Sequence, residues 1–243
     1  MSARTANGRS GLALRAIRCL LRLATDKAYR GVRWLNFRNP VNAFQPSNTT
    51  SKNRYPHIFA FVQSRLGREC KGRILSFGCS TGEEVFSLRH YFPQAFIKGI
   101  DINSGNIAAC KRQLKLADDA AITFEITDST AAEPTTSYDV IFCMAVLRHG
   151  GLALPSVTRC DHLISFEDFA RMVEDFARCL KPGGLLAIRH SNFRFCDTAA
   201  SANFVTVLRI PLRGGNTTPL FGPDNRLMEG AVYEDTVFQK ANT

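Results

Sequence analysis

The stretch of sequence that decides the fold is ILSFGCSTGEEVFSL, residues 74–88. Four mostly apolar residues run into a turn that holds Gly78 and Gly82, and the adjacent carboxylates Glu83 and Glu84 follow. This arrangement is typical of a buried strand that passes through a tight turn into a helix. Glycine-rich turns at such junctions usually hold a ligand against backbone N–H groups. The stretch therefore predicts an α/β protein with a ligand at this turn.

Strands and helices alternate through the rest of the chain. Strands are predicted at residues 73–77, 96–102, 122–126, 139–144 and 185–190, with helices at 57–67, 83–91 and 103–116. A further helix begins at Ser165, where Asp168 completes a capping-box pattern, and it stops at KPGG. Two late strands, near 204–210 and 232–240, have no helix between them and are expected to pair antiparallel. The expected fold is α/β: a Rossmann-like, doubly wound, seven-stranded, mostly parallel sheet with an antiparallel edge strand and an N-terminal helical extension.

Length and charge divide the chain into three parts. The 243 residues suit one large domain with a modest extension. The net charge of +10 is concentrated in residues 1–40, which hold nine Lys/Arg against Asp26, so that the remaining 203 residues carry only +2. We expect a basic amphipathic extension at 1–37, a linker and helix at 38–67 and the ligand-binding domain at 68–243.

The basic extension allows three interpretations. Its polar residues recur every three or four positions between residues 12 and 34, as in an amphipathic helix. Such a helix can pack on its own domain, contact an anionic membrane surface through residues 11–36, or act as an organelle-targeting segment. The eight cysteines form no C-x-x-C pair and do not cluster with histidines, so we expect no metal site and a reducing, cytoplasmic compartment, with peripheral membrane attachment as the variant.

The residues that follow each strand indicate the ligand, because ligands of open α/β sheets bind at the carboxyl ends of the strands. A dinucleotide turn reads G-x-G-x-x-G, whereas the turn here spaces its glycines as G-x-x-x-G and places two carboxylates after them. Carboxylates disfavour a pyrophosphate, and Glu83 is suited to a cationic ligand group. Asp101, with Ile102 beside it, ends the second strand and can accept both hydroxyls of a ribose.

The third and fourth strands complete this description. Asp128 can accept from an exocyclic amine such as adenine N6, and the Ser129 N–H can face the ring. Met144 and Ala145 follow the fourth strand and offer apolar packing. The set describes an adenosine with a cationic, amino-acid-like tail and no phosphates, which fits S-adenosylmethionine.

At this point the sequence resembles the class I S-adenosylmethionine-dependent methyltransferases over residues 73–240. The segments that carry the resemblance are ILSFGCSTGEE, KGIDIN, YDVIFCMAVL, LKPGGLLAIRHS and VFQK. The likeness is greatest to the cofactor domain of the chemotaxis-receptor (CheR-type) methyltransferases, whose N-x-T-x-x-x-R loop is matched by Asn48, Thr50 and Arg54. The resemblance implies that the linker closes the cofactor site, with Arg54 near the methionine carboxylate and Met144 and Ala145 on the pocket floor. The residues expected around the cofactor are Asn48, Thr50, Arg54, Gly78, Cys79, Ser80, Gly82, Glu83, Asp101, Ile102, Asp128, Ser129, Met144 and Ala145.

The sequence departs from those enzymes at two places. Only 26 residues separate Asp101 from Asp128, too few for their receptor-docking β-subdomain, and Met144-Ala145 replaces their Arg-Asn pair. Glutamate methylation therefore does not carry over. His149 and His190 are candidates for a base or a substrate contact, and a solvated loop histidine is the more common role at such positions.

The substrate is expected to be a small, anionic or lipid-linked metabolite, because Arg148, Arg189 and Arg194 lie near the same edge of the sheet. The alternatives are a methyltransferase of protein or RNA and a non-catalytic relative that keeps the cofactor fold. The sequence has no N-P-P-Y segment after the fourth strand, and residues 41–243 are nearly neutral. Both features argue against a nucleic acid as the methylated substrate. The oligomeric state stays open.

Overall fold

The computed structural model describes residues 21, 24–26, 29–31, 44–45, 50–154, 156–211 and 218–242. The predicted amphipathic helix at 11–36 lies largely outside these residues, and so does Asn48. No helix in the described part of the chain is long and apolar enough to cross a membrane.

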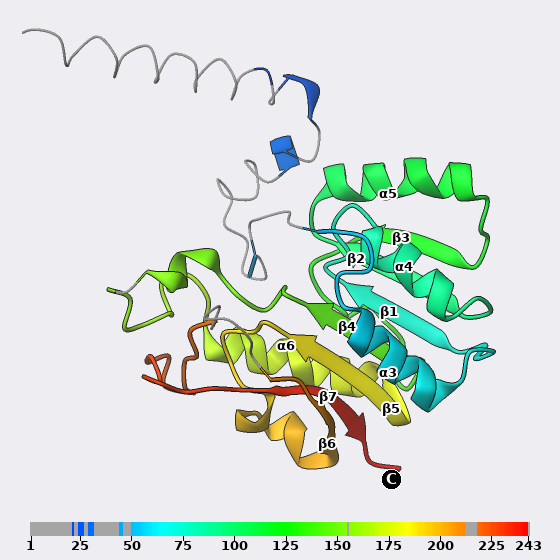
Figure 1. Ribbon diagram of the computed structural model, residues 1–243. Helices are drawn as coiled ribbons and strands as arrows, with labels where there is room; N and C mark the ends of the chain where they lie inside the picture. The colour runs from blue at the N-terminus through cyan, green and yellow to red at the C-terminus, as the bar shows by residue number, and fades with distance from the viewer. Residues whose placement is uncertain are drawn as a thin grey trace, which may run out of the picture.

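One seven-stranded sheet forms the centre of the molecule, in the order β3-β2-β1-β4-β5-β7-β6 (Figure 1). Its strands are β1 (Arg73–Phe77), β2 (Phe96–Asp101), β3 (Ile122–Ile126), β4 (Tyr138–Met144), β5 (Leu180–Arg189), β6 (Phe204–Arg209) and β7 (Asp235–Lys240). The first five strands are parallel, and β7 runs antiparallel to both β5 and β6. The predicted fold class and the antiparallel pair are confirmed, and β7 is inserted between β5 and the edge strand β6.

Helices cover both faces of the sheet (Figure 1). They are α3 (Pro56–Leu66), α4 (Glu83–Tyr91), α5 (Ser104–Ala117) and α6 (Phe166–Cys179), with the short 3-10 turns η1 (Gly150–Ala153), η2 (Phe195–Asp197) and η3 (Ala199–Asn203). Helices α3, α4 and α5 pack with Ile74 and Val140 on one face, whereas α6 packs with the neighbouring Leu75 and Ile141 on the other. Successive strand residues thus serve opposite cores, as expected for a sheet buried on both sides.

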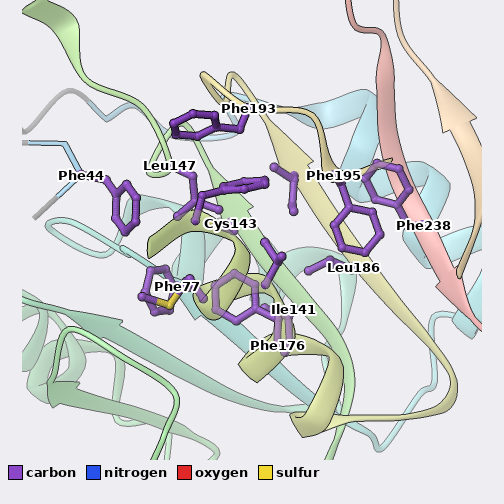
Figure 2. Packing of buried hydrophobic residues seen from close by; sticks show 14 of the residues in the cluster. Phe44, Phe77, Ile141, Cys143, Leu147, Phe176, Leu186, Phe193, Phe195 and Phe238 are labelled. Carbon is purple, nitrogen blue, oxygen red and sulfur yellow. The ribbon is translucent and has the colours of Figure 1, made fainter. Parts of the chain in front are cut away.

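The core beneath α6 is rich in phenylalanine (Figure 2). The rings of Phe77 and Phe176 meet edge-on with centroids 4.9 Å apart, and those of Phe195 and Phe238 are 4.6 Å apart. Phe44, from the linker, is buried in the same cluster. The linker is therefore anchored to the body of the domain at this point.

Helix α6 begins as the sequence predicts and ends differently. The Ser165 hydroxyl accepts from the Asp168 N–H at 3.1 Å, which caps the helix. The segment KPGG does not lie in a loop after the helix, because β5 starts directly at Leu180 and runs through it. The predicted strand at 185–190 is wrong at both ends, since His190 has a φ of +55° and leaves the sheet.

Candidate cofactor and acceptor site

Strained backbone gathers at the carboxyl ends of β1, β4 and β5, which are neighbours in the sheet. Ser80, Ala145 and His190 follow these strands with φ values of +51°, +60° and +55°. A left-handed backbone conformation costs free energy in residues other than glycine. It persists where the surrounding structure enforces it, often at functional sites. Three such residues at one edge mark it as the candidate site.

The glycine turn after β1 is held tightly under the loop that follows β4. Gly78 has a φ of +71°, and a Cβ at this position would overlap the Val146 methyl groups. The Gly78 and Cys79 N–H groups both donate to the Ile100 carbonyl at 2.9 Å. Gly82, with a φ of +98°, leads into α4. Both glycines are therefore required by backbone conformation.

Asp101 connects the end of β2 to this turn. Its side chain is 8% exposed, and its Oδ2 accepts from the Ser80 N–H at 2.8 Å. Its Oδ1 accepts from the Asn103 N–H at 2.8 Å and from the Asn106 side chain at 3.0 Å. Burial raises the pKa of Asp101, and these three hydrogen bonds oppose the rise. Asp101, which is predicted to bind the ribose, therefore also fixes the glycine turn. This second role was not predicted from the sequence.

A small cavity of about 40 Å³ lies between the turn, the linker and β4. Its lining residues are Thr50, Ser51, Arg54, Tyr55, Phe59, Gly78, Cys79, Ser80, Glu84 and Met144. We call it the methionine-end pocket, after the part of the cofactor that is predicted from the sequence to lie beside Thr50 and Arg54. The structure thus brings six of the predicted cofactor residues together, from three separate segments of the chain.

Glu84, and not the predicted Glu83, lines this pocket. Its Oε1 accepts from the Ser76 hydroxyl at 2.8 Å. Burial raises the pKa of Glu84 to about 7, against the Ser76 hydrogen bond and the positive charge of Arg54, which lower it. The spacing of the sequence could have indicated Glu84, because Glu84 lies four residues before the buried Leu88 and therefore on the same face of the helix.

Glu83 points elsewhere. Both of its carboxylate oxygens accept from the Thr81 hydroxyl, at 2.9 and 2.7 Å. It lines a separate hollow of about 890 Å³ that Lys52 and Gln113 also line. The prediction that Glu83 faces the cofactor therefore conflicts with the helix phase of α4.

The residues predicted at the adenine end follow β3, next to β2. Asp128 and Ser129 are both partly buried, and the Ser129 N–H donates to the Thr127 hydroxyl at 3.3 Å. The Thr127 N–H donates in turn to the Asp101 carbonyl at 3.2 Å. Ile102 directly follows Asp101 and is partly buried. These residues line up beside Asp101, one strand away from the glycine turn.

Three arginine side chains act electrostatically on Tyr55 at the edge of the pocket, and the His190 imidazole lies beside its ring. The basic cluster, as we call it, consists of Arg54, Arg148, Arg189 and His190. The Arg54 guanidinium lies 5.2 Å from the Tyr55 ring centroid, and the His190 and Tyr55 rings are 6.0 Å apart. Burial, with the charges of Arg189, Arg148 and Arg54, lowers the pKa of His190 to about 4. His190 is therefore neutral at physiological pH.

Three buried polar atoms at this site have no hydrogen-bond partner among the residues that the structure describes. They are the Tyr55 hydroxyl, the Ser80 hydroxyl and Nε of Arg148. Arg189 differs, since it donates to the Ile210 carbonyl at 2.9 Å and to the Thr236 hydroxyl at 3.2 Å. Buried donors without partners cost free energy and are typical of sites that accept a ligand.

Two predicted residues have structural partners. His149 accepts from the Gly151 N–H through Nδ1 at 3.1 Å, which caps η1, and burial lowers its pKa. Its own N–H donates to the Asn192 side chain at 2.7 Å. Arg194 forms a bidentate pair with Asp197, at 2.8 and 2.7 Å. Arg194 is thus not part of the basic cluster.

The doubly wound sheet, the glycine turn and the carboxylate at the end of β2 are the arrangement that the resemblance to S-adenosylmethionine-dependent methyltransferases predicts. Residues 75–186 match the family described as "Methyltransferase domain". Over these 112 residues, just under half of the chain, the protein is similar to methyltransferase domains.

Individual proteins show the same likeness. The chain is 28% identical over 130 residues to trans-aconitate 2-methyltransferase of Methylobacterium nodulans, covering 54% of this chain and 42% of that protein. It is 27% identical over 112 residues to malonyl-[acyl-carrier protein] O-methyltransferase of Bacillus cytotoxicus, covering 46% and 38%. The solved structure of phosphoethanolamine N-methyltransferase 2 from Haemonchus contortus with S-adenosyl-L-methionine matches with a TM-score of 0.42 at 19% identity, covering 58% and 29%. The chain spans about two fifths of the length of the curated relatives it matches.

Proposed function

We propose that the protein transfers a methyl group from S-adenosylmethionine to a small anionic metabolite. The observation that carries this proposal is the basic cluster, which adjoins the methionine-end pocket through Tyr55. A site with three guanidinium groups attracts an anion and repels a cation. Two of the relatives, trans-aconitate 2-methyltransferase and malonyl-[acyl-carrier protein] O-methyltransferase, are named after substrates that contain a carboxylic acid.

The pocket residues fit the amino-acid end of the cofactor. The proposed partners are Glu84 for the ammonium group and Arg54 for the carboxylate, because their charges are opposite and both line the same pocket. The unpartnered Ser80 hydroxyl supplies a further hydrogen bond, and Gly78 leaves room for close approach. The proposed ribose and adenine partners are Asp101 and Asp128, as predicted from the sequence.

When bound, S-adenosylmethionine supplies a methyl group on a sulfonium, which needs no further activation. The protein has to hold the acceptor in line with that methyl group and to exclude water, and positioning of this kind can contribute several kcal/mol. Arg148 and Arg189, the cations of the basic cluster that are not assigned to the cofactor, do this by attracting the anionic end of the substrate. A base is required only where the acceptor has to lose a proton.

The finer parts of the prediction remain proposals. A lipid-linked substrate and membrane contact would depend on residues 11–36. Binding to anionic vesicles, compared between the full chain and a chain lacking residues 1–37, tests this dependence directly.

The likeness to the CheR-type cofactor loop is supported by the position of Thr50 and Arg54 in the methionine-end pocket. Cytoplasmic localisation also remains a prediction.

Calorimetry followed by a turnover assay tests the proposed function. We expect the full chain to bind S-adenosylmethionine and S-adenosylhomocysteine with micromolar dissociation constants, near −8 kcal/mol. Incubation with pools of anionic metabolites should then release S-adenosylhomocysteine. A folded protein that binds neither compound contradicts the proposal. Binding without turnover favours the non-catalytic alternative, and turnover only with RNA or protein favours the macromolecular one.

A further inference from the structure

We infer that the hollow beside α4 is a regulatory site for a single-chain amphiphile with an anionic head group, such as a fatty acid. We call this cavity the outer hollow. Its effect on the cofactor rests on the proposed function, whereas ligand binding in the hollow does not.

The outer hollow runs along α4, from Glu83 in the first turn of the helix to Tyr91 in the last. Residues of α3, α5 and the linker complete its lining, and Figure 1 shows α4 between α3 and α5. Its volume of about 890 Å³ lies in the range that is typical of ligand pockets. The outer hollow shares no lining residue with the methionine-end pocket, so it is a separate cavity.

Part of the lining is apolar. Phe86 of α4 contributes to it, together with Leu116 and Ala117 at the end of α5. Leu116 is 89% exposed, more than any other large hydrophobic side chain in the described part of the chain. An apolar chain that covers these side chains would remove apolar surface from water, which favours binding.

Unpaired basic side chains line the same cavity. Lys52, Arg68 and His90 are exposed and form no hydrogen bond or ion pair with any residue that the structure describes. Among the described lining residues, the single carboxylate is Glu83, which accepts from the Thr81 hydroxyl. The charges of Lys52 and Arg68 outnumber it, so the lining attracts an anionic head group.

Other occupants match this lining less well. A cationic ligand, or the basic extension at residues 1–37, would bring positive charge toward Lys52 and Arg68. A second copy that presents the same face would place those cations against their own equivalents. An anion without an apolar chain would leave Leu116 in water. A chain with one anionic end satisfies both parts of the lining.

The linker connects the outer hollow to the methionine-end pocket. Lys52 and Asn53 line the hollow, whereas the residues on either side of them, Ser51 and Arg54, line the pocket. Four successive residues therefore form a wall between the two cavities. A ligand in one cavity acts on the same backbone segment that a ligand in the other contacts.

Two hydrogen bonds fix this wall to α4. The Asn53 N–H donates to the Ser87 hydroxyl at 2.8 Å, and the Asn53 side chain accepts from the Tyr91 hydroxyl at 3.0 Å. Asn53 has a φ of +49°, a conformation that its surroundings must enforce. A ligand held between Lys52 and α4 stabilises the linker in this position. We therefore expect it to tighten cofactor binding, and by reciprocity the cofactor to tighten binding in the hollow.

Calorimetric titration with decanoate tests the site. Decanoate, 1-decanol and decyltrimethylammonium carry apolar chains of similar length with anionic, neutral and cationic ends, and each is used below its solubility and micelle limits. We expect decanoate to bind at one site, 1-decanol to bind about tenfold or more weakly, and the cation not to bind.

Substitutions of exposed residues locate that site. Leu116→Glu, and the double variant Lys52→Gln with Arg68→Gln, should each weaken decanoate binding about tenfold or more. The matched controls lie outside the hollow. Val205→Glu changes a side chain of edge strand β6 that is 62% exposed, and Arg226→Gln changes one that is 71% exposed. Both controls should bind decanoate as the wild type does.

Titration with S-adenosylhomocysteine, with and without saturating decanoate, tests the coupling. We expect decanoate to lower the dissociation constant about fivefold or more in the wild type. The double variant Ser87→Ala with Tyr91→Phe lacks both hydrogen bonds to Asn53. It should still bind decanoate and lose the coupling. Full coupling in this variant would overturn the role of the linker.

The outcomes separate the inference from the proposed function. Failure to bind S-adenosylmethionine would contradict the proposed function and the coupling, and decanoate binding would still support the site. No decanoate binding, or equal affinity in the wild type and Leu116→Glu, would overturn the site. Equal affinity for 1-decanol would overturn the anionic head group, and an unchanged S-adenosylhomocysteine affinity would overturn the regulatory role. A wild-type dimer in sedimentation velocity that Leu116→Glu lacks would assign the hollow to a second copy instead.

Discussion

The Asp101 carboxylate accepts a hydrogen bond from the Ser80 N–H at 2.8 Å, which joins the end of β2 to the glycine turn after β1. Ser80 sits in a left-handed conformation, with a φ of +51°. A buried, charge-assisted hydrogen bond of this kind can stabilise a strained turn. The carboxylate that is expected to hold the ribose thus also shapes the glycine turn after β1.

Replacement of Asp101 should therefore affect both stability and binding. Asp101→Ala leaves the N–H groups of Ser80 and Asn103 without their acceptor, and we expect a loss of about 2–3 kcal/mol in the free energy of unfolding. Asp101→Asn keeps one acceptor oxygen and should lose about half as much. Urea unfolding and calorimetric titration with S-adenosylhomocysteine measure the two effects. Unchanged stability in Asp101→Ala would show that the turn does not depend on this carboxylate.

Glu84 should make stability and cofactor binding depend on pH in opposite directions. Because its pKa is raised to about 7, the folded protein binds more protons than the unfolded chain between pH 4.5 and 7, and stability from this group falls as pH rises through that range. Cofactor affinity should rise over the upper part of this range, as the carboxylate ionises to meet the ammonium. Glu84→Gln should remove both trends, raise the unfolding free energy at pH 8 by about 1–3 kcal/mol and weaken cofactor binding at least tenfold.

The adjacent Glu83→Gln is the matched control for this prediction, because Glu83 bonds to Thr81 outside the pocket. Calorimetry and thermal unfolding from pH 5 to 8 measure both variants. A larger effect of Glu83→Gln than of Glu84→Gln on cofactor affinity would support the assignment made from the sequence.

Gly78 should tolerate no side chain. Gly78→Ala introduces a Cβ that overlaps Val146 and places alanine at a φ of +71°, and we expect a loss of about 2–4 kcal/mol in unfolding free energy. In the double variant with Val146→Ala, the overlap is relieved while the backbone strain remains. The double-mutant cycle, measured by urea unfolding, should therefore recover part of the loss. Simple additivity of the two losses would exclude the contact with Val146 as the cause.

His149 should act on stability and not on turnover. Its Nδ1 caps η1, so His149→Ala should lose about 1 kcal/mol in unfolding free energy, and His149→Asn should restore part of it. We expect kcat and its pH profile to stay within about twofold of the wild type in both variants. A large fall in kcat with normal stability would return His149 to the catalytic candidates.

Several parts of the fold can be read from local sequence because their causes are local. The boundaries of β1, β3 and α4 coincide with the predicted ones, and the Ser165 cap is where the capping-box pattern places it. Apolar runs, glycine turns and caps specify these elements within a few residues. The start of β5 was missed because its pairing with β4, with a register shift after Tyr138, overrides the turn preference of KPGG.

The sequence by itself determined the fold class of this protein. The order of strands and helices, the turn at Gly78 and Gly82, and Asp101 one strand later indicate a cofactor site at the carboxyl ends of a parallel sheet. Only the tertiary structure decided which side chains face that site. The phase of α4 selects Glu84 over Glu83, the cap of η1 occupies His149, and Asp197 occupies Arg194. The physical reason is that the direction of a side chain depends on helix rotation and on partners distant in sequence, which a local pattern of residue types does not specify.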